Sequence, residues 1–93
     1  MANEITTPET FLNANEMREK FFRDDVNSIL TMITNRFLQS RRNPIIRMLQ
    51  AELQAYPVDV IQYVKSLLNT RGYVLTDIED NNNNVLGFKI SLP

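Results

Sequence analysis

The feature that most constrains the fold is the run of residues 15–40, which has helical periodicity on two sides. Placed at 100° steps around a helix axis, one apolar set spans an arc of about 100°, the width of a face that packs on a protein core. This core-facing stripe consists of Phe22, Val26, Ile29, Leu30, Ile33 and Phe37. A second stripe, Met17, Phe21 and Met32, lies on the far side. The run therefore predicts one long helix with two apolar faces.

The length of this helix predicts that it extends beyond its own domain. A helix over residues 14–40 is roughly 40 Å long at 1.5 Å per residue, whereas a compact domain of this size has a radius of gyration of about 12 Å. The core-facing stripe begins only at Phe22, but the far stripe begins earlier. Burying an exposed Phe or Met side chain is worth about 1.5–3 kcal/mol. We therefore expect Met17, Phe21 and Met32 to bind a second copy of the chain. The alternative is that they are scattered surface residues, which are common.

Residues that end or begin helices divide the remainder of the chain. Asn43-Pro44 ends the long helix, since the residue before a proline disfavours helical geometry, and Pro57 begins another helix that ends near Gly72, a residue suited to a left-handed C-cap. Residues 44–55 have the composition and apolar spacing of a short helix, with a strand over 45–49 as the alternative. Residues 73–78 and 85–92 have strand patterns, and the asparagine-rich stretch between them is a turn.

These patterns predict a single α+β domain over residues 1–93. We expect a flexible polar arm (1–6), a long helical region (8–42), a helical pair (44–71) and a C-terminal antiparallel β-hairpin (73–92). The start of the long helix has two readings. Thr7 and Pro8 can begin a helix, and Asn13 with Glu16 three residues later forms a capping box. Residues 8–13 thus either continue the long helix or form a separate short one.

Composition excludes most chemistry and several partner classes. The chain has no cysteine and no histidine, which removes thiol chemistry, the commonest general base and the commonest metal ligand. With two glycines it has no phosphate-cradling loop. We expect no enzyme activity, no cofactor and no metal. A net charge of −1 attracts neither nucleic acid nor an anionic membrane. There is no apolar run long enough to span a bilayer, and residues 1–8 lack the features of a secretion signal.

One basic cluster is a candidate ligand site. Arginines gather around the corner that follows the long helix, with no acid between them: Arg36, Arg41, Arg42 and Arg47. Arginine forks and a helix N-terminus both suit phosphate-like anions, so a nucleotide-sequestering oligomer is an alternative function. The simpler reading is that these arginines complement the C-terminal end of a helix dipole and remain in water.

A winged-helix DNA-binding protein is a further alternative, because two short helices followed by a hairpin have that order of elements. The helix that would enter the groove exposes a nearly neutral set of side chains, and the hairpin tip is acidic. These exposed residues are Asp59, Gln62, Lys65, Ser66 and Asn69. Phosphate binding needs several lysine or arginine contacts, so nucleic acid is an unfavoured partner.

The chain also resembles small tailed-phage proteins of about a hundred residues. The resemblance lies in Asn-Glu-Met-Arg-Glu-Lys (15–20), in Val-Ile-Gln-Tyr-Val-Lys-Ser-Leu-Leu-Asn-Thr-Arg-Gly-Tyr-Val-Leu (60–75) and in the closing Phe-Lys-Ile-Ser-Leu (88–92). This chain ends in Leu92-Pro93, where those proteins have an aromatic residue. The resemblance implies a phage accessory or virion-associated protein, located in the host cytoplasm or the virion. We expect it to act without catalysis, through contacts with itself and with another phage or host protein.

Overall fold

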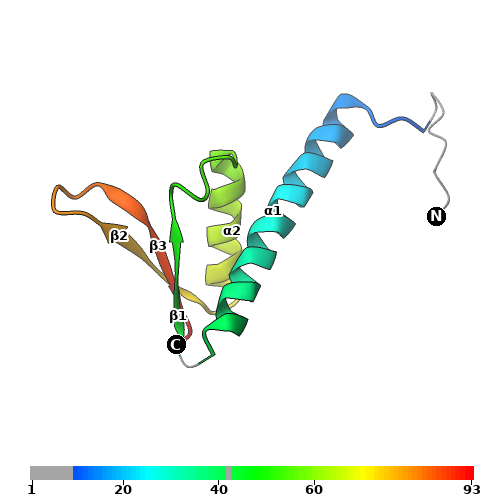
Figure 1. Ribbon diagram of the computed structural model, residues 1–93. Coiled ribbons are helices and arrows are strands. Elements are labelled where there is room, and N and C mark those ends of the chain that lie inside the picture. The colour runs from blue at the N-terminus through cyan, green and yellow to red at the C-terminus, as the bar shows by residue number, and fades with distance from the viewer. Residues whose placement is uncertain (1–9, 42) are drawn as a thin grey trace.

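A computed structural model describes residues 10–41 and 43–93. The described chain forms two helices and a three-stranded antiparallel sheet, in the order α1 (Ala14–Gln39), β1 (Ile45–Leu49), α2 (Val58–Thr70), β2 (Val74–Glu79) and β3 (Val85–Ser91). The strand order in the sheet is β1–β3–β2, and both helices lie to one side of the sheet (Figure 1). The predicted α+β class is confirmed. The predicted count of three helices is wrong.

Helix α1 begins with the predicted capping box. The Asn13 side chain accepts a hydrogen bond from the Glu16 backbone N–H at 2.9 Å, and the Glu16 carboxylate accepts one from the Asn13 N–H at 3.0 Å. These bonds satisfy two of the backbone donors that a helix start leaves free. Residues 10–13 are not helical. The alternative start at Thr7 and Pro8, and the predicted arm over residues 1–6, lie outside the described residues.

The core-facing stripe of α1 is confirmed. Val26, Ile29 and Ile33 are buried, and the other three predicted members pack against the core around them. Helix α2 contributes Val60, Val64 and Leu68 from its own apolar face. Together with the inward row of the sheet these side chains make one continuous core.

The predicted helix over 44–55 is wrong, and the strand named as its alternative is present. Residues 45–49 form β1, an edge strand that pairs with β3, and residues 50–55 form turns. Ile46 and Met48 point into the core, while Ile45 and Leu49 point to the opposite face. A five-residue stretch with two adjacent isoleucines suits a strand, and pairing with a distant strand outweighs the helical composition that follows. The predicted hairpin is therefore part of a three-stranded sheet.

The β2–β3 hairpin is confirmed and carries one irregularity. Ile78 is opposite Gly87, and Glu79 is opposite Val85, so Leu86 is an extra residue that forms a bulge. Gly87 lies directly against β1: a Cβ there would meet the Met48 carbonyl oxygen and lie 2.8 Å from the Leu49 Cα. Only glycine allows the two backbones to approach so closely.

The molecule is elongated because α1 extends beyond everything else. The principal extents are 53 × 31 × 23 Å and the radius of gyration is 16.9 Å, compared with about 12 Å for a compact domain of this length. Figure 1 shows the N-terminal half of α1 projecting away from α2 and from the sheet. The predicted overhang of the long helix is thus present.

Candidate interaction surface

The first two turns of α1 form a free-standing segment, Ala14–Phe21. The first α1 residue that packs against the core is Phe22, whose ring meets the Tyr63 ring edge-on at 5.3 Å. Among the described residues, none before Phe22 belongs to the core or packs on it. In the part of the chain that the structure describes, the core therefore does not reach this segment.

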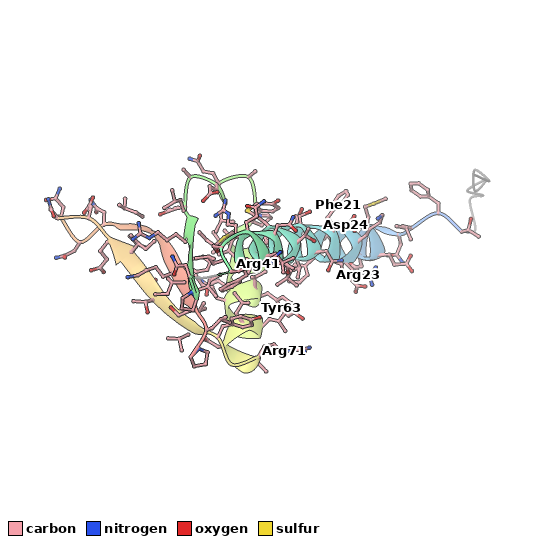
Figure 2. All side chains as sticks on the ribbon, turned by 60° about the horizontal axis from the view of Figure 1, so that its bottom comes forward. Phe21, Arg23, Asp24, Arg41, Tyr63 and Arg71 are labelled. Atoms are coloured by element: carbon pink, nitrogen blue, oxygen red, sulfur yellow. The ribbon has the colours of Figure 1, made fainter. Side chains whose placement is uncertain are left out.

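Two of the three predicted interface residues lie on the free-standing segment. Phe21 is 59% exposed, and Figure 2 shows it on the side of α1 opposite to Tyr63 and Arg71 of α2. Met17 is partly buried. Met32 is different, because it is partly buried and packs against the core of its own subunit. Phe11, just before the helix, is 64% exposed.

Charged side chains border this apolar strip and pair along the helix. The Lys20 ammonium lies 3.0 Å from the Asp24 carboxylate, one turn later, and Arg18 donates to the Asn15 side chain at 2.9 Å. Phe21 and Asp24 appear on the same side of α1 in Figure 2. An exposed phenyl ring with both signs of charge beside it is a pattern that suits a specific helix partner better than an undifferentiated apolar patch does.

The predicted arginine corner does not converge on a single site. The Arg36 guanidinium forms a salt bridge with Glu52, donates to the Arg47 carbonyl oxygen at 2.6 Å and lies 3.3 Å from the Met48 sulfur. Arg41 is exposed beside a shallow hollow near the end of α1. Arg42 is outside the described residues. Sequence analysis missed Glu52 as an acid that reaches this corner, because it lies in the turns after β1.

Arg36 and Glu52 have a structural role at the open edge of β1. Arg36 donates a hydrogen bond to the Arg47 carbonyl oxygen. Glu52 accepts one from the Leu49 N–H at 2.9 Å, and the Asn43 side chain accepts one from the Ile45 N–H at 3.1 Å. Edge strands that leave such groups free are templates for unwanted pairing. These side chains therefore protect the edge and leave Arg36 with little capacity for a ligand.

The Arg47 side chain instead lies on the outer face of the sheet. It is exposed, and Lys89 is its direct cross-strand neighbour on β3. Ile45 and Leu49 flank it on β1, each about two-fifths exposed. Within the described part of the chain, no salt bridge joins Arg47 or Lys89 to an acid. Like charges directly opposite each other are unfavourable in a sheet, so this face suits an anion.

The order of elements expected of a DNA reader is not present, because residues 45–49 form β1 and α2 alone stands between it and the hairpin in the described chain. Helix α2 exposes Asp59, Gln62 and Asn69. Lys65 is partly buried and lies over the Phe88 ring, 4.7 Å from its centroid, so it points into the domain. The hairpin that would act as the wing ends in Glu79 and Asp80. This surface therefore offers few of the cationic contacts that bind phosphates.

One hollow of the described chain lies between α2, β3 and the turns after β1. It has a volume of about 250 Å³ and is bordered by Leu53, Ile61, Lys65 and Phe88. Among residues 10–41 and 43–93, no group of three or more acidic side chains is placed to hold a metal ion. In the same part of the chain, neither helix has the length and apolar character needed to cross a membrane.

Comparison with known proteins does not assign this chain to a family. No family model, no curated protein and no solved structure matches it. The resemblance to small tailed-phage proteins stays a prediction.

Proposed function

We propose that this chain is a non-catalytic, self-associating protein and that the free-standing segment of α1 is its partner-binding element. The observation that carries the proposal is the exposure of Phe21 on a helical segment with no contact to its own core. Burial of that ring in a partner is worth about 1.5–3 kcal/mol.

The lack of core packing along this segment supports the same proposal. Most helix stability in proteins comes from tertiary packing, and among the described residues the core does not reach Ala14–Phe21. Its capping box and its Lys20–Asp24 pair add only local stability. A second copy packed along this segment supplies the burial that its own chain does not. Self-association is favoured over a different partner because one surface can serve both copies, as in the two-fold dimers that dominate among oligomers.

The phage-like resemblance gives this proposal a biological setting. An interaction protein of this kind is an accessory or virion-associated component, present in the host cytoplasm or in the virion. In that setting a further phage or host protein can bind surfaces that self-association leaves free.

Absolute mass in solution tests the proposal. We expect light scattering to give a multiple of the 10.8 kDa chain mass for the parent, and the monomer mass for Phe21→Glu. Leu38→Glu is the matched control, because Leu38 is equally exposed near the other end of the same helix; it should keep the parent's mass. A parent that remains monomeric across micromolar concentrations would refute self-association. Loss of the oligomer in Leu38→Glu alone would place the interface elsewhere.

Anion binding is the second candidate function, and the Arg47–Lys89 pair favours it. Arg47 is exposed and Lys89, directly opposite it, is partly exposed, with Ile45 and Leu49 on either side of Arg47. We expect nucleotides or tripolyphosphate to raise the melting temperature of the parent, and Lys89→Gln to lose that increase. Arg41→Gln tests the corner expected from sequence and should retain it. The absence of any shift with anions would end this candidate.

A further inference from the structure

We infer that two copies pair through α1 in antiparallel orientation, with a two-fold axis passing beside Phe21. This inference rests on the proposed self-association and specifies its geometry. The exposed stripe of α1 is one-sided: at 100° steps, its members fall within an arc of about 60°. They are Ala14, Met17, Phe21 and Ser28. Phe21 lies at the middle of the stretch from Ala14 to Ser28.

A two-fold axis at Phe21 matches residues of suitable size. In a two-fold interface each residue meets the one equally far on the other side of the axis. Phe21 then meets its own copy, and offset or edge-on aromatic pairs are favourable. Ala14 meets Ser28, so a small side chain faces a small one at each end of the seam.

Charge selects the antiparallel orientation. At 100° steps Arg18 and Asp25 lie on one flank of Phe21, and Lys20 and Asp24 lie on the other. In an antiparallel pair each flank meets the same flank of the partner, so Arg18 comes near the partner's Asp25. On the other flank Asp24, which already holds Lys20 of its own chain at 3.0 Å, comes near the partner's Lys20. A parallel pair would instead place Asp24 of one copy beside Asp25 of the other, and such a like-charge contact disfavours the wrong arrangement.

The geometry of the subunit leaves room for this dimer. The free-standing segment Ala14–Phe21 and the following stretch to Ser28 are each about 10 Å long at 1.5 Å per residue, so each copy covers the bare segment of the other. Figure 2 shows Phe21 and Asp24 on the side of α1 away from α2. Ser28 is also exposed. The two domains therefore lie on the outside of the helix pair, without overlap.

Disulfide trapping tests the orientation cleanly, because the chain has no cysteine of its own. A disulfide requires Cα atoms within roughly 7 Å. Under mild oxidation Phe21→Cys should give a covalent dimer. Ala14→Cys and Ser28→Cys should each remain monomeric on a non-reducing gel, whereas their mixture should give about tenfold more covalent dimer than either alone. Leu38→Cys, exposed but outside the seam, is the control and should not cross-link.

The outcomes separate the orientation from self-association itself. Covalent dimer from Ala14→Cys alone would mean a parallel pair and would overturn the inference, and so would failure of Phe21→Cys to cross-link in a parent that light scattering shows to be oligomeric. A monomeric parent would overturn both this inference and the proposed function. Each variant changes a surface residue, and a circular-dichroism spectrum equal to the parent's verifies its fold.

Discussion

The free-standing segment Ala14–Phe21 and the rest of α1 share one continuous backbone but have different surroundings. After Phe22, Val26, Ile29 and Ile33 are buried against α2 and the sheet. Before Phe22, no described residue of α1 belongs to the core or packs on it. Tertiary packing normally provides most of a helix's stability in a protein, so the free-standing segment depends on the rest of the helix for its conformation. The comparison teaches that α1 is both a structural element and a projecting interaction element, with the boundary at Phe22.

Truncation in the packed half should have the largest effect on stability. Ile29 is 1% exposed, and Ile29→Ala should lower the free energy of unfolding by about 2–5 kcal/mol, because it removes buried methyl groups and leaves a cavity. Urea denaturation measures this. Phe21→Ala is the matched change in the free-standing segment. In dilute, monomeric protein it should alter the free energy of unfolding by no more than about 0.5 kcal/mol. Equal losses in the two variants would mean that Phe21 also packs in its own subunit.

Breaking the two ion pairs of α1 should also cost more stability in the packed part of the helix than near its free-standing segment, but both losses should be smaller. Arg36→Ala removes contacts to Glu52, to the Arg47 carbonyl and to the Met48 sulfur. Since the pair is about 30% exposed, we expect a loss of about 1–2 kcal/mol, reduced by solvent screening. Lys20→Ala breaks a pair whose side chains are more than half exposed and should cost about 0–0.5 kcal/mol. A double-mutant cycle with Glu52→Ala isolates the coupling. Similar losses of stability in Lys20→Ala and Arg36→Ala would contradict the protective role of Arg36 at the β1 edge.

Loss of the N-cap should destabilise only the first turns of α1. Asn13→Ala removes the capping bond to Glu16, which is worth about 1 kcal/mol to a helix end. Because no described residue of Ala14–Phe21 packs on the core, the first turns of α1 should unfold locally. Hydrogen exchange of amides 14–21 should accelerate, while the midpoint of global unfolding stays unchanged. Asn35→Ala, an exposed change in the packed half, should accelerate none of these amides. A shifted global midpoint would show that the two halves unfold as one unit.

Local signals in the sequence predicted much of this fold. The two faces of α1, the Asn13–Glu16 capping box and the helix before Gly72 each depend on residues within a few turns of one another. The left-handed geometry at Gly72 and at Asn83 in the hairpin turn is also local chemistry. Such features follow from spacing alone.

The features that the sequence analysis missed depend on distant residues. β1 is a strand because Ile46 and Met48 pair with Ile90 and Phe88, some forty positions later, and nothing near residue 45 signals that partner. The partner of Arg36 was missed for the same reason: Glu52 lies 16 residues after Arg36 and reaches it only once β1 and its turns are in place. Met32 fits the far stripe by angle, but the fold brings core residues around to it.

The hairpin turn is a second projecting part. It differs from the free-standing segment of α1 because hydrogen bonds within the turn satisfy its polar groups. The Asp80 carboxylate accepts the backbone N–H groups of Asn84 at 3.0 Å and of Asn82 at 2.8 Å. These bonds, that from Asn84 above all, hold the pKa of Asp80 below its ordinary value. They favour the charged form, so they stabilise the folded state when the carboxylate is ionised.

The hydrogen bonds to Asp80 should make the stability of the protein depend on pH, and this is the smallest of the effects predicted here. Because the folded-state pKa of Asp80 is lowered, its contribution is fully present above the unfolded-state value of about 3.9 and is lost as the pH falls through the folded-state pKa. Between about pH 5 and pH 3 the parent should therefore lose slightly more stability than Asp80→Asn, whose side chain does not ionise. Urea midpoints across that range measure the difference. Parallel curves would mean that the turn is not held by this carboxylate, and then both projecting parts of the molecule would need a partner.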